Sequence, residues 1–155
     1  MSKLLTINII RTGLQTTIQD LGRPNYQSSG IPLGGALDRM AAIQANYLVE
    51  NPLDAPVLEV TLLGPKLQFS ESCQIALSGA DLSAKVNGQT IARYATISIE
   101  PGDHLSFGKA HVGCRAYLAI RGTWMIQKWL GSASLATQHH EKLTADSLLS
   151  TGKII

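Results

Sequence analysis

Short apolar runs alternate with turn signals from residue 56 to residue 120, and this rhythm constrains the fold more than any other feature of the sequence. The runs occupy residues 56–63, 66–69, 74–77, 84–86, 90–92, 96–99, 104–107 and 115–120. Segments this short are typical of strands rather than helices. Asn87-Gly88 between two of them is a strong hairpin signal, because both central positions of a type I′ turn need positive φ. The pattern predicts a mainly β fold, either an antiparallel barrel or a sandwich.

One helix is expected in this β-rich chain, over residues 38–50. Asp38 is a suitable N-cap, and Asn51-Pro52 ends the helix. Three apolar side chains recur along it at helical spacing, Met40, Ile43 and Tyr47, and Ala41, Ala45 and Leu48 lie close beside them. Residues 126–131 are expected to form a second, short helical turn.

A long glycine-rich stretch, residues 20–37, follows two expected strands at 4–10 and 15–19. Its repeated glycines and two prolines exclude regular structure over such a length. Leu21, Tyr26 and Ile31 give it apolar anchors, so we interpret it as a loop of the domain rather than a linker. Loops of this length inside a compact domain are often functional.

Polar groups in this loop and its flanks each have an ordinary structural interpretation beside a functional one. Glu59 interrupts an apolar strand, where a lone carboxylate is costly to bury, so it either faces solvent or serves a site. Asp20 and Arg23 either pair locally as a structural clamp or belong to a site. Asp38 either only caps the helix, which is worth about 1 kcal/mol, or has a further role. The residues alone indicate no particular reaction.

Common catalytic and cofactor motifs are absent from the sequence. Gly152-Lys153 lacks the rest of a phosphate-binding loop, and no GxSxG motif surrounds a serine. Neither His104 with His111 nor the adjacent pair at 139–140 has a spacing that favours a metal site, so no metal is expected. The net charge of +2 comes from scattered lysines and arginines, and nucleic-acid binding is therefore not expected.

The composition, 45% hydrophobic and 15% charged over 155 residues, is typical of one globular domain. Cys73 and Cys114 lie in apolar, strand-like runs and are expected to be two buried, unpaired thiols. The first ten residues lack the features of a signal peptide, and no apolar run approaches the roughly 20 residues of a membrane span. We expect a soluble, cytoplasmic protein.

Several strings of the chain resemble one protein family. Residues 13–23 read GLQTTIQDLGR, and residues 30–38 read GIPLGGALD, with Gln27 between them. The resemblance continues through residues 45–46, 51–52, 58–65, 78–82, 87–88, 101–103, 113–119, 121–122 and 130–132. Together these strings resemble the N-terminal half of the family that contains the C subunit of bacterial 5-oxoprolinase, KipA, the so-called allophanate hydrolase subunit 2 and the carboxyltransferase region of urea carboxylase.

The resemblance implies a cyclophilin-like antiparallel β-barrel with one main helix at 38–50. The family builds this barrel twice in tandem, so residues 1–155 are expected to form one domain that is equivalent to the N-terminal half. The implied partners are the missing C-terminal half and a KipI-like protein, the B subunit of 5-oxoprolinase. The sequence departs from the family pattern at Thr123, where a second glycine is usual, and again after Ser132, so no role is carried over to residues 123–155.

The resemblance implies two kinds of reaction. The first hypothesis is a subunit or fragment of a 5-oxoprolinase-type complex, which opens 5-oxoproline to glutamate with ATP and is incomplete as this chain alone. The alternatives are a carboxyltransferase that moves a carboxyl group from carboxybiotin to urea, and a KipA-like binding module that antagonises a KipI-like partner. No cofactor is expected on this chain itself, since ATP belongs to the complex and biotin, in the alternative, to a partner domain.

Both reactions need donors for a developing oxyanion and a group that transfers a proton. The residues expected to be catalytic are Gln19, Asp20, Arg23, Gln27 and Asp38. Those expected to bind substrate are Gly34, Gly35, Asn46 and Glu59.

Overall fold

The computed structural model describes residues 4–135 and 152–154. Its elements are β1 (Ile7–Arg11), β2 (Gln15–Gln19), a 3₁₀ turn η1 (Gln27–Ser29), α1 (Arg39–Leu48), β3 (Val57–Thr61), β4 (Lys66–Phe69), β5 (Cys73–Asp81), β6 (Lys85–Val86), β7 (Gln89–Thr90), β8 (Thr96–Ile99), β9 (His104–Ser106), β10 (Val112–Ile120) and β11 (Gly152–Ile154). None of the described helices is long and apolar enough to cross a membrane.

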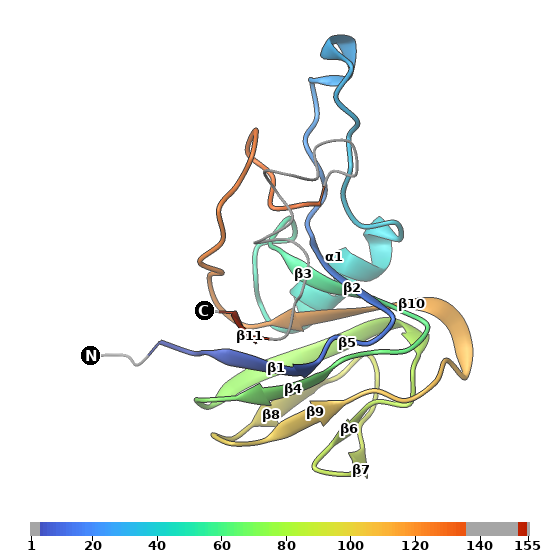
Figure 1. Ribbon diagram of the computed structural model, residues 1–155, viewed down its shortest axis with the longest axis vertical. Coiled ribbons are helices and arrows are strands. Elements are labelled where there is room, and N and C mark those ends of the chain that lie inside the picture. Colours follow the sequence, from blue (N-terminus) through green and yellow to red (C-terminus); the bar gives the residue numbers. More distant parts are fainter. Residues whose placement is uncertain (1–3, 136–151, 155) are drawn as a thin grey trace.

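The strands form two antiparallel sheets. Sheet A has the order β11-β1-β4-β9-β6-β7, and sheet B has the order β2-β3-β10-β5-β8. Figure 1 shows the two sheets stacked in the lower part of the molecule, with α1 against the outer face of sheet B. The mainly β, antiparallel prediction with one main helix is confirmed, although the sheets formed by the described residues stay separate and do not close into a barrel.

The main core lies between the sheets. Sheet A contributes side chains such as Ile9, Leu67 and Leu105, and sheet B contributes Leu58 and Leu118, all nearly inaccessible to solvent. Alternate residues along each strand face this core, which is the period-two pattern of a two-layer β structure. The predicted hairpin at Asn87-Gly88 joins β6 to β7, and both residues have positive φ, at 48° and 83°.

Helix α1 packs on sheet B through small side chains. Asp38 caps it by accepting a hydrogen bond from the Ala41 N–H at 3.0 Å, as predicted. Ala41, Ala42 and Ala45 are buried, whereas Met40 and Tyr47 of the predicted apolar stripe are 64% and 73% exposed. The prediction was thus right for Ala41 and Ala45 and wrong for Met40 and Tyr47, because alanines let the helix approach the sheet more closely than the larger side chains would.

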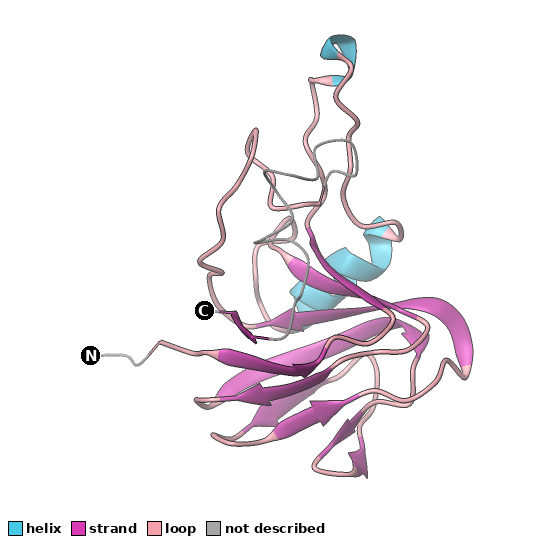
Figure 2. Ribbon diagram, in the orientation of Figure 1, coloured by secondary structure: helices cyan, strands magenta, loops and turns pink. Residues whose placement is uncertain are grey.

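The glycine-rich stretch projects from the sandwich as a long loop with η1 at its tip, the small helical turn at the top of Figure 2. Its two arms join at the base, where the Arg23 N–H donates to the Leu33 carbonyl at 2.7 Å and the Ala36 N–H to the Asp20 carbonyl at 2.9 Å. A Cβ on Gly22 would lie 2.4 Å from the Leu33 oxygen, so this contact requires glycine.

The short helical turn expected at 126–131 is not formed. Instead Trp129 and Ser132 pair across a tight turn, with the Trp129 N–H donating to the Ser132 carbonyl at 2.9 Å. Leu130 and Gly131 at its centre have φ of 49° and 80°, values that a right-handed helix excludes.

Candidate functional site

Asp20 is buried at the base of the long loop and tied to the segment at 132–134. Its carboxylate accepts hydrogen bonds from the hydroxyls of Ser132 and Ser134, both at 2.6 Å, and from the N–H groups of Gly22 and Ala133, both at 2.7 Å. Four donors satisfy most of the lone pairs of one carboxylate. This packing supplies a structural role for Asp20, and its predicted catalytic role stays a prediction.

Arg23 lies beside Asp20 and is completely buried. Its Nη2 donates to the Ser134 carbonyl, its Nε to the Trp129 carbonyl at 3.5 Å, and its guanidinium lies 5.1 Å from the Trp129 ring centroid. Burial lowers the pKa of the Arg23 guanidinium, and the nearby Asp20 carboxylate opposes that shift. Asp20 and Arg23 thus form a clamp between the loop and residues 129–134, as one of the two sequence interpretations proposed.

The other loop and helix residues predicted to act in a site are dispersed. Gln27 lies in η1, exposed at the tip of the loop. Gly34 and Gly35 lie at the loop base, where a Cβ on Gly35 would be 2.8 Å from the Gly22 nitrogen. Asn46 is buried in α1 and donates to the Ala55 carbonyl at 2.7 Å. The structure therefore does not bring these residues together in one cavity.

A polar strip crosses the outer face of sheet B next to α1. Antiparallel register aligns Thr17, Glu59, Tyr117 and Ser78 in one row over β2, β3, β10 and β5. Paired residues of neighbouring strands point to the same face, so these side chains project on the helix side. Gln19 is two residues beyond Thr17 on β2 and shares that face.

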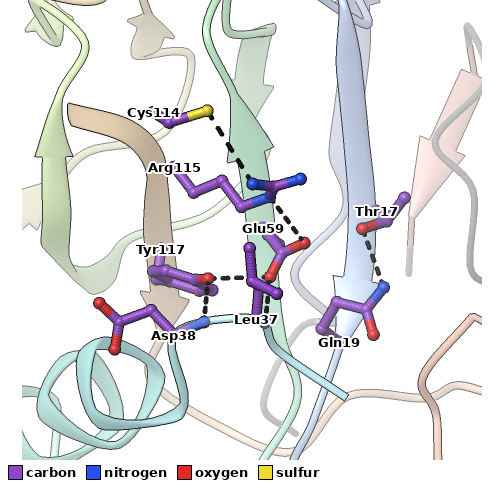
Figure 3. A network of polar contacts seen from close by, with 8 residues as sticks. All are labelled: Thr17, Gln19, Leu37, Asp38, Glu59, Cys114, Arg115 and Tyr117. Carbon is purple, nitrogen blue, oxygen red and sulfur yellow. Dashed lines mark hydrogen bonds and ion pairs between the residues drawn. The ribbon is translucent and has the colours of Figure 1, made fainter. Parts of the chain in front are cut away.

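Glu59 is the centre of a hydrogen-bond network on this strip (Figure 3). Its Oε2 accepts from the Leu37 N–H at 2.8 Å and from the Tyr117 hydroxyl at 2.9 Å, while the Asp38 N–H donates to that hydroxyl at 2.8 Å. Its Oε1 faces the Arg115 Nε at 3.6 Å. The Glu59 side chain is only 11% exposed, so the solvent-facing interpretation is wrong, and the network is what makes burial of a carboxylate tolerable.

Tyr117 acts in this network as a donor. Burial raises the pKa of its hydroxyl above the ordinary value, which the hydrogen bond from the Asp38 N–H partly opposes and the Glu59 carboxylate reinforces. The phenol is therefore protonated at neutral pH, and its proton lies on the hydrogen bond to Glu59. The N-cap residue Asp38 consequently fixes the position of Tyr117 through its backbone, while its carboxylate caps α1.

Two buried polar atoms on the strip have no hydrogen-bond partner within the described residues: the Gln19 Oε1, an acceptor, and the Arg115 Nε, a donor. Gln19 uses its other amide atom, Nε2, to donate to the Thr17 hydroxyl at 3.1 Å. The Arg115 Nε makes no hydrogen bond, but it is ion-paired with the Glu59 Oε1 at 3.6 Å. The Gln19 Oε1 has no such partner, and because buried polar atoms are nearly always paired in native proteins, it points to a missing donor.

A cleft of about 410 Å³ opens beside the strip. The residues that line it include Tyr117, Arg115, Leu37, Asp38, Arg93 and Tyr94. Tyr117 and Arg115 thus connect Glu59 to this cleft. We define the candidate site as the strip residues Thr17, Gln19, Glu59, Arg115 and Tyr117 together with the cleft. Within the described residues, no group of three His, Cys, Asp or Glu side chains is placed to hold a metal ion.

The two cysteines differ in exposure, which makes thiol labelling a direct check of the cleft. Cys114 lines the cleft and is exposed, contrary to the sequence expectation, whereas Cys73 is half-buried and its pKa is raised to about 12 by burial and by Asp103. The raised pKa keeps Cys73 protonated at pH 8, and only the thiolate reacts. We expect one fast-reacting thiol per folded chain with a disulfide reagent at pH 8, and two after unfolding. The fast phase disappears in Cys114→Ser if the assignment is right, and its persistence there would contradict it.

Sequence reasoning identified Glu59, Gln19 and Asp38 but missed Tyr117 and Arg115. The sequence signal that could have found them is Glu59 itself, because a buried carboxylate needs a hydrogen-bond or charge partner, here on a neighbouring strand. The alternation of Arg115, Tyr117 and Ala119 along one strand supplies that partner, but only the register shows that Tyr117 lies opposite Glu59.

The comparisons with known proteins agree on one family. A family model described as carboxyltransferase domain, subdomain A and B, matches residues 29–154. The urea amidolyase of Lachancea kluyveri is 41% identical over 133 residues, which cover 85% of this chain and 7% of that protein. The C subunit of 5-oxoprolinase from Escherichia coli is 36% identical over 128 residues, covering 83% of this chain and 41% of that protein.

A solved structure gives the same result. The crystal structure of the Kluyveromyces lactis urea carboxylase superposes with a TM-score of 0.89 at 38% identity, over 95% of this chain and 13% of that one. The chain thus spans less than half the length of these relatives. The family inferred from the sequence strings is confirmed: this chain belongs to the carboxyltransferase domain family, subdomains A and B.

Proposed function

We propose that the chain contributes one wall of a site that binds a planar amide or ureido group, as part of a larger enzyme. The observation that carries the proposal is the buried Gln19 Oε1, which has no hydrogen-bond partner within the described residues and lies on the same face of sheet B as the Arg115 guanidinium. An N–C=O group needs an acceptor for its N–H and a donor for its carbonyl oxygen. The strip offers both, because the Gln19 Oε1 can accept and the Arg115 guanidinium can donate. The Glu59 Oε1, which the Leu37 and Tyr117 donors do not use, is held by the ion pair with the Arg115 Nε at 3.6 Å.

The network around Glu59 suits it to hold a substrate N–H. Leu37 and Tyr117 fix one carboxylate oxygen, which leaves the other aimed at Arg115. Packing and hydrogen bonds already hold the Glu59 carboxylate in place, so it does not have to rearrange when a substrate binds. Such a fixed group can position the reacting part of a substrate. Arg115 lines the cleft with a side chain that is 31% exposed, so guanidinium N–H groups other than the buried Nε can donate to a carbonyl oxygen there.

Our first candidate reaction is the ATP-dependent opening of 5-oxoproline to glutamate, in which this chain acts as a subunit or fragment of a 5-oxoprolinase-type complex. The similarity to the C subunit of 5-oxoprolinase supports it, and 5-oxoproline carries one ring amide of the required kind. The proposed partners are a KipI-like B subunit of 5-oxoprolinase and a C-terminal half that completes the site. ATP would enter with the complex, and we place the complex in the cytoplasm.

The second candidate is carboxyl transfer to urea or a related amide, with biotin carried by a partner domain. It is favoured by the description of the matching family model and by the 41% identity to a urea amidolyase. Urea presents the same pairing of N–H and carbonyl groups, so the strip suits either substrate.

Reconstitution separates these candidates. The chain is mixed with the A and B subunits of a 5-oxoprolinase and with the C-terminal half of its C subunit, and glutamate release from 5-oxoproline is measured with and without ATP. We expect ATP-dependent release by the full mixture and no turnover by the chain alone. Bicarbonate- and ATP-dependent consumption of urea with biotin carboxylase and carrier domains, in place of glutamate release, would select the second candidate. Turnover by the isolated chain would contradict the proposed incomplete site.

A further inference from the structure

A row of basic side chains crosses the outer face of sheet A, on the opposite side of the molecule's core from the strip. Register pairs Arg11 of β1 with Lys66 of β4, Lys66 with Ser106 of β9, and Ser106 with Lys85 of β6. Paired residues share a face, and Leu105 beside Ser106 points into the core, so this row points outward. The four residues line one cavity of about 640 Å³ together with His104 and Asn87.

A β-bulge places Arg11 in this row. Ile9 pairs with Leu67, and the register then shifts so that Arg11 rather than Ile10 pairs with Lys66. Without the shift, Arg11 would follow Ile9 on the core-facing side. Bulges of this kind re-aim side chains and recur beside functional sites. Arg11 Nη2 also donates to the Phe107 carbonyl at 3.3 Å, which holds the guanidinium at the cavity wall.

The positive charges in the row are not neutralised within the described part of the chain. No acidic side chain lines the cavity, and neither ion pair found there involves Arg11, Lys66 or Lys85. The nearby carboxylate of Asp103 is already bound by the Asn87 side chain at 2.7 Å and the Glu100 N–H at 2.9 Å. Like charges directly opposite on neighbouring strands destabilise a sheet, so this arrangement favours an added anion.

We propose that this cavity binds a phosphoryl group, as inorganic phosphate or as part of a nucleotide. Lys66 and Lys85 flank Ser106 on either side, about 10 Å apart between backbones at the usual strand spacing, so their flexible ammonium groups can converge on one anion above the hydroxyl. Three cations and a hydroxyl match the charge and acceptor oxygens of phosphate better than those of a single carboxylate. The Asn87 amide also lines the cavity but is engaged by Asp103 and the His104 N–H. The inference rests on sheet A alone and is independent of the strip on sheet B.

The test is calorimetric titration of the purified chain with inorganic phosphate, pyrophosphate and ATP, at constant ionic strength maintained with KCl. We expect saturable binding, with Lys66→Gln and Lys85→Gln each raising the Kd by about tenfold, the factor for losing one hydrogen bond to a charged group. Lys66→Arg retains the charge and is expected to retain most of the affinity. Equal Kd values for the three anions would show that the site binds a single phosphoryl group. Tighter binding of pyrophosphate and ATP than of phosphate would show that it binds a polyphosphate.

The matched control is Lys128→Gln, which removes the same charge from an exposed lysine outside the cavity. It is expected to leave every Kd within about twofold, because exposed charges more than about 10 Å from a ligand are largely screened at 0.1 M salt. If Lys128→Gln lost as much affinity as Lys66→Gln and Lys85→Gln, the loss would come from the change in net charge alone, and the proposal would be overturned. Absence of saturable binding up to ~10 mM would overturn it as well, since a site with a Kd of about 1 mM would then be filled.

Discussion

Glu59→Gln is expected to lower the kcat/KM of the reconstituted enzyme by about 100-fold while leaving the chain folded. The glutamine oxygen can still accept from the Leu37 N–H and the Tyr117 hydroxyl, which hold the Glu59 Oε2 at 2.8 and 2.9 Å. The other end of the side chain changes from an acceptor to an NH₂ donor, which cannot accept a substrate N–H. The lost ion pair with Arg115 is partly exposed and contributes at most about 1 kcal/mol to the free energy of unfolding.

Steady-state kinetics and urea unfolding of the same variant separate a functional from a structural role. Glu50→Gln is the control, because Glu50 is exposed and pairs at the surface with the Arg121 Nη2 at 2.6 Å. We expect its kcat/KM to be unchanged. Full activity in Glu59→Gln would show that the Glu59 carboxylate does not act on the substrate. A loss of activity matched by unfolding would assign the residue to the fold instead.

Asp20→Ala is expected to lower the free energy of unfolding by about 3–5 kcal/mol, because it removes a buried charge that several groups bind. The substitution leaves the hydroxyls of Ser132 and Ser134 and the N–H groups of Gly22 and Ala133 without their acceptor. It also removes the negative charge nearest to the buried guanidinium of Arg23. A domain of this size has about 5–15 kcal/mol of stability in total, so the variant is expected to be close to unfolding.

Urea unfolding at pH 7 measures this effect as a lower midpoint with an unchanged slope. Asp54→Ala serves as the matched control, since Asp54 is exposed, and is expected to change the free energy of unfolding by no more than about 0.5 kcal/mol. Asp20→Asn keeps an acceptor oxygen and is expected to lie between the two. A loss below about 1 kcal/mol in Asp20→Ala would show that residues 129–134 dock without this clamp.

Local sequence signals predicted most of the strands and the helix. The strands at 66–69 and 96–99 have the bounds that their apolar runs suggested, because polar turn residues flank each run closely. The Asn87-Gly88 hairpin and the Asp38 cap were predicted for the same reason: each depends on the conformation of a few adjacent residues. The turn at 129–132 was missed because Leu130 adopts positive φ there, which its residue type does not indicate.

The candidate site was predicted only in part. Glu59 stood out as a carboxylate in an apolar strand and Gln19 as a polar residue beside the long loop, and both lie on the strip. Gln27 and Asn46 looked equally suitable as donors, yet one lies at an exposed loop tip and the other is occupied inside α1. Residue type shows which chemistry a side chain can perform, but it does not show which way the side chain faces.

The sequence by itself determined most of the strands, the main helix and its cap, the Asn87-Gly88 hairpin and the family, because these depend on neighbouring residues or on strings that remain together along the chain. The tertiary structure alone decided that Tyr117 lies opposite Glu59, that Asp20 binds residues more than 100 positions away, and that a bulge turns Arg11 toward Lys66. The physical reason is strand register: a shift of one residue moves every side chain of a strand to the other face, and register is set by the packing of the whole core.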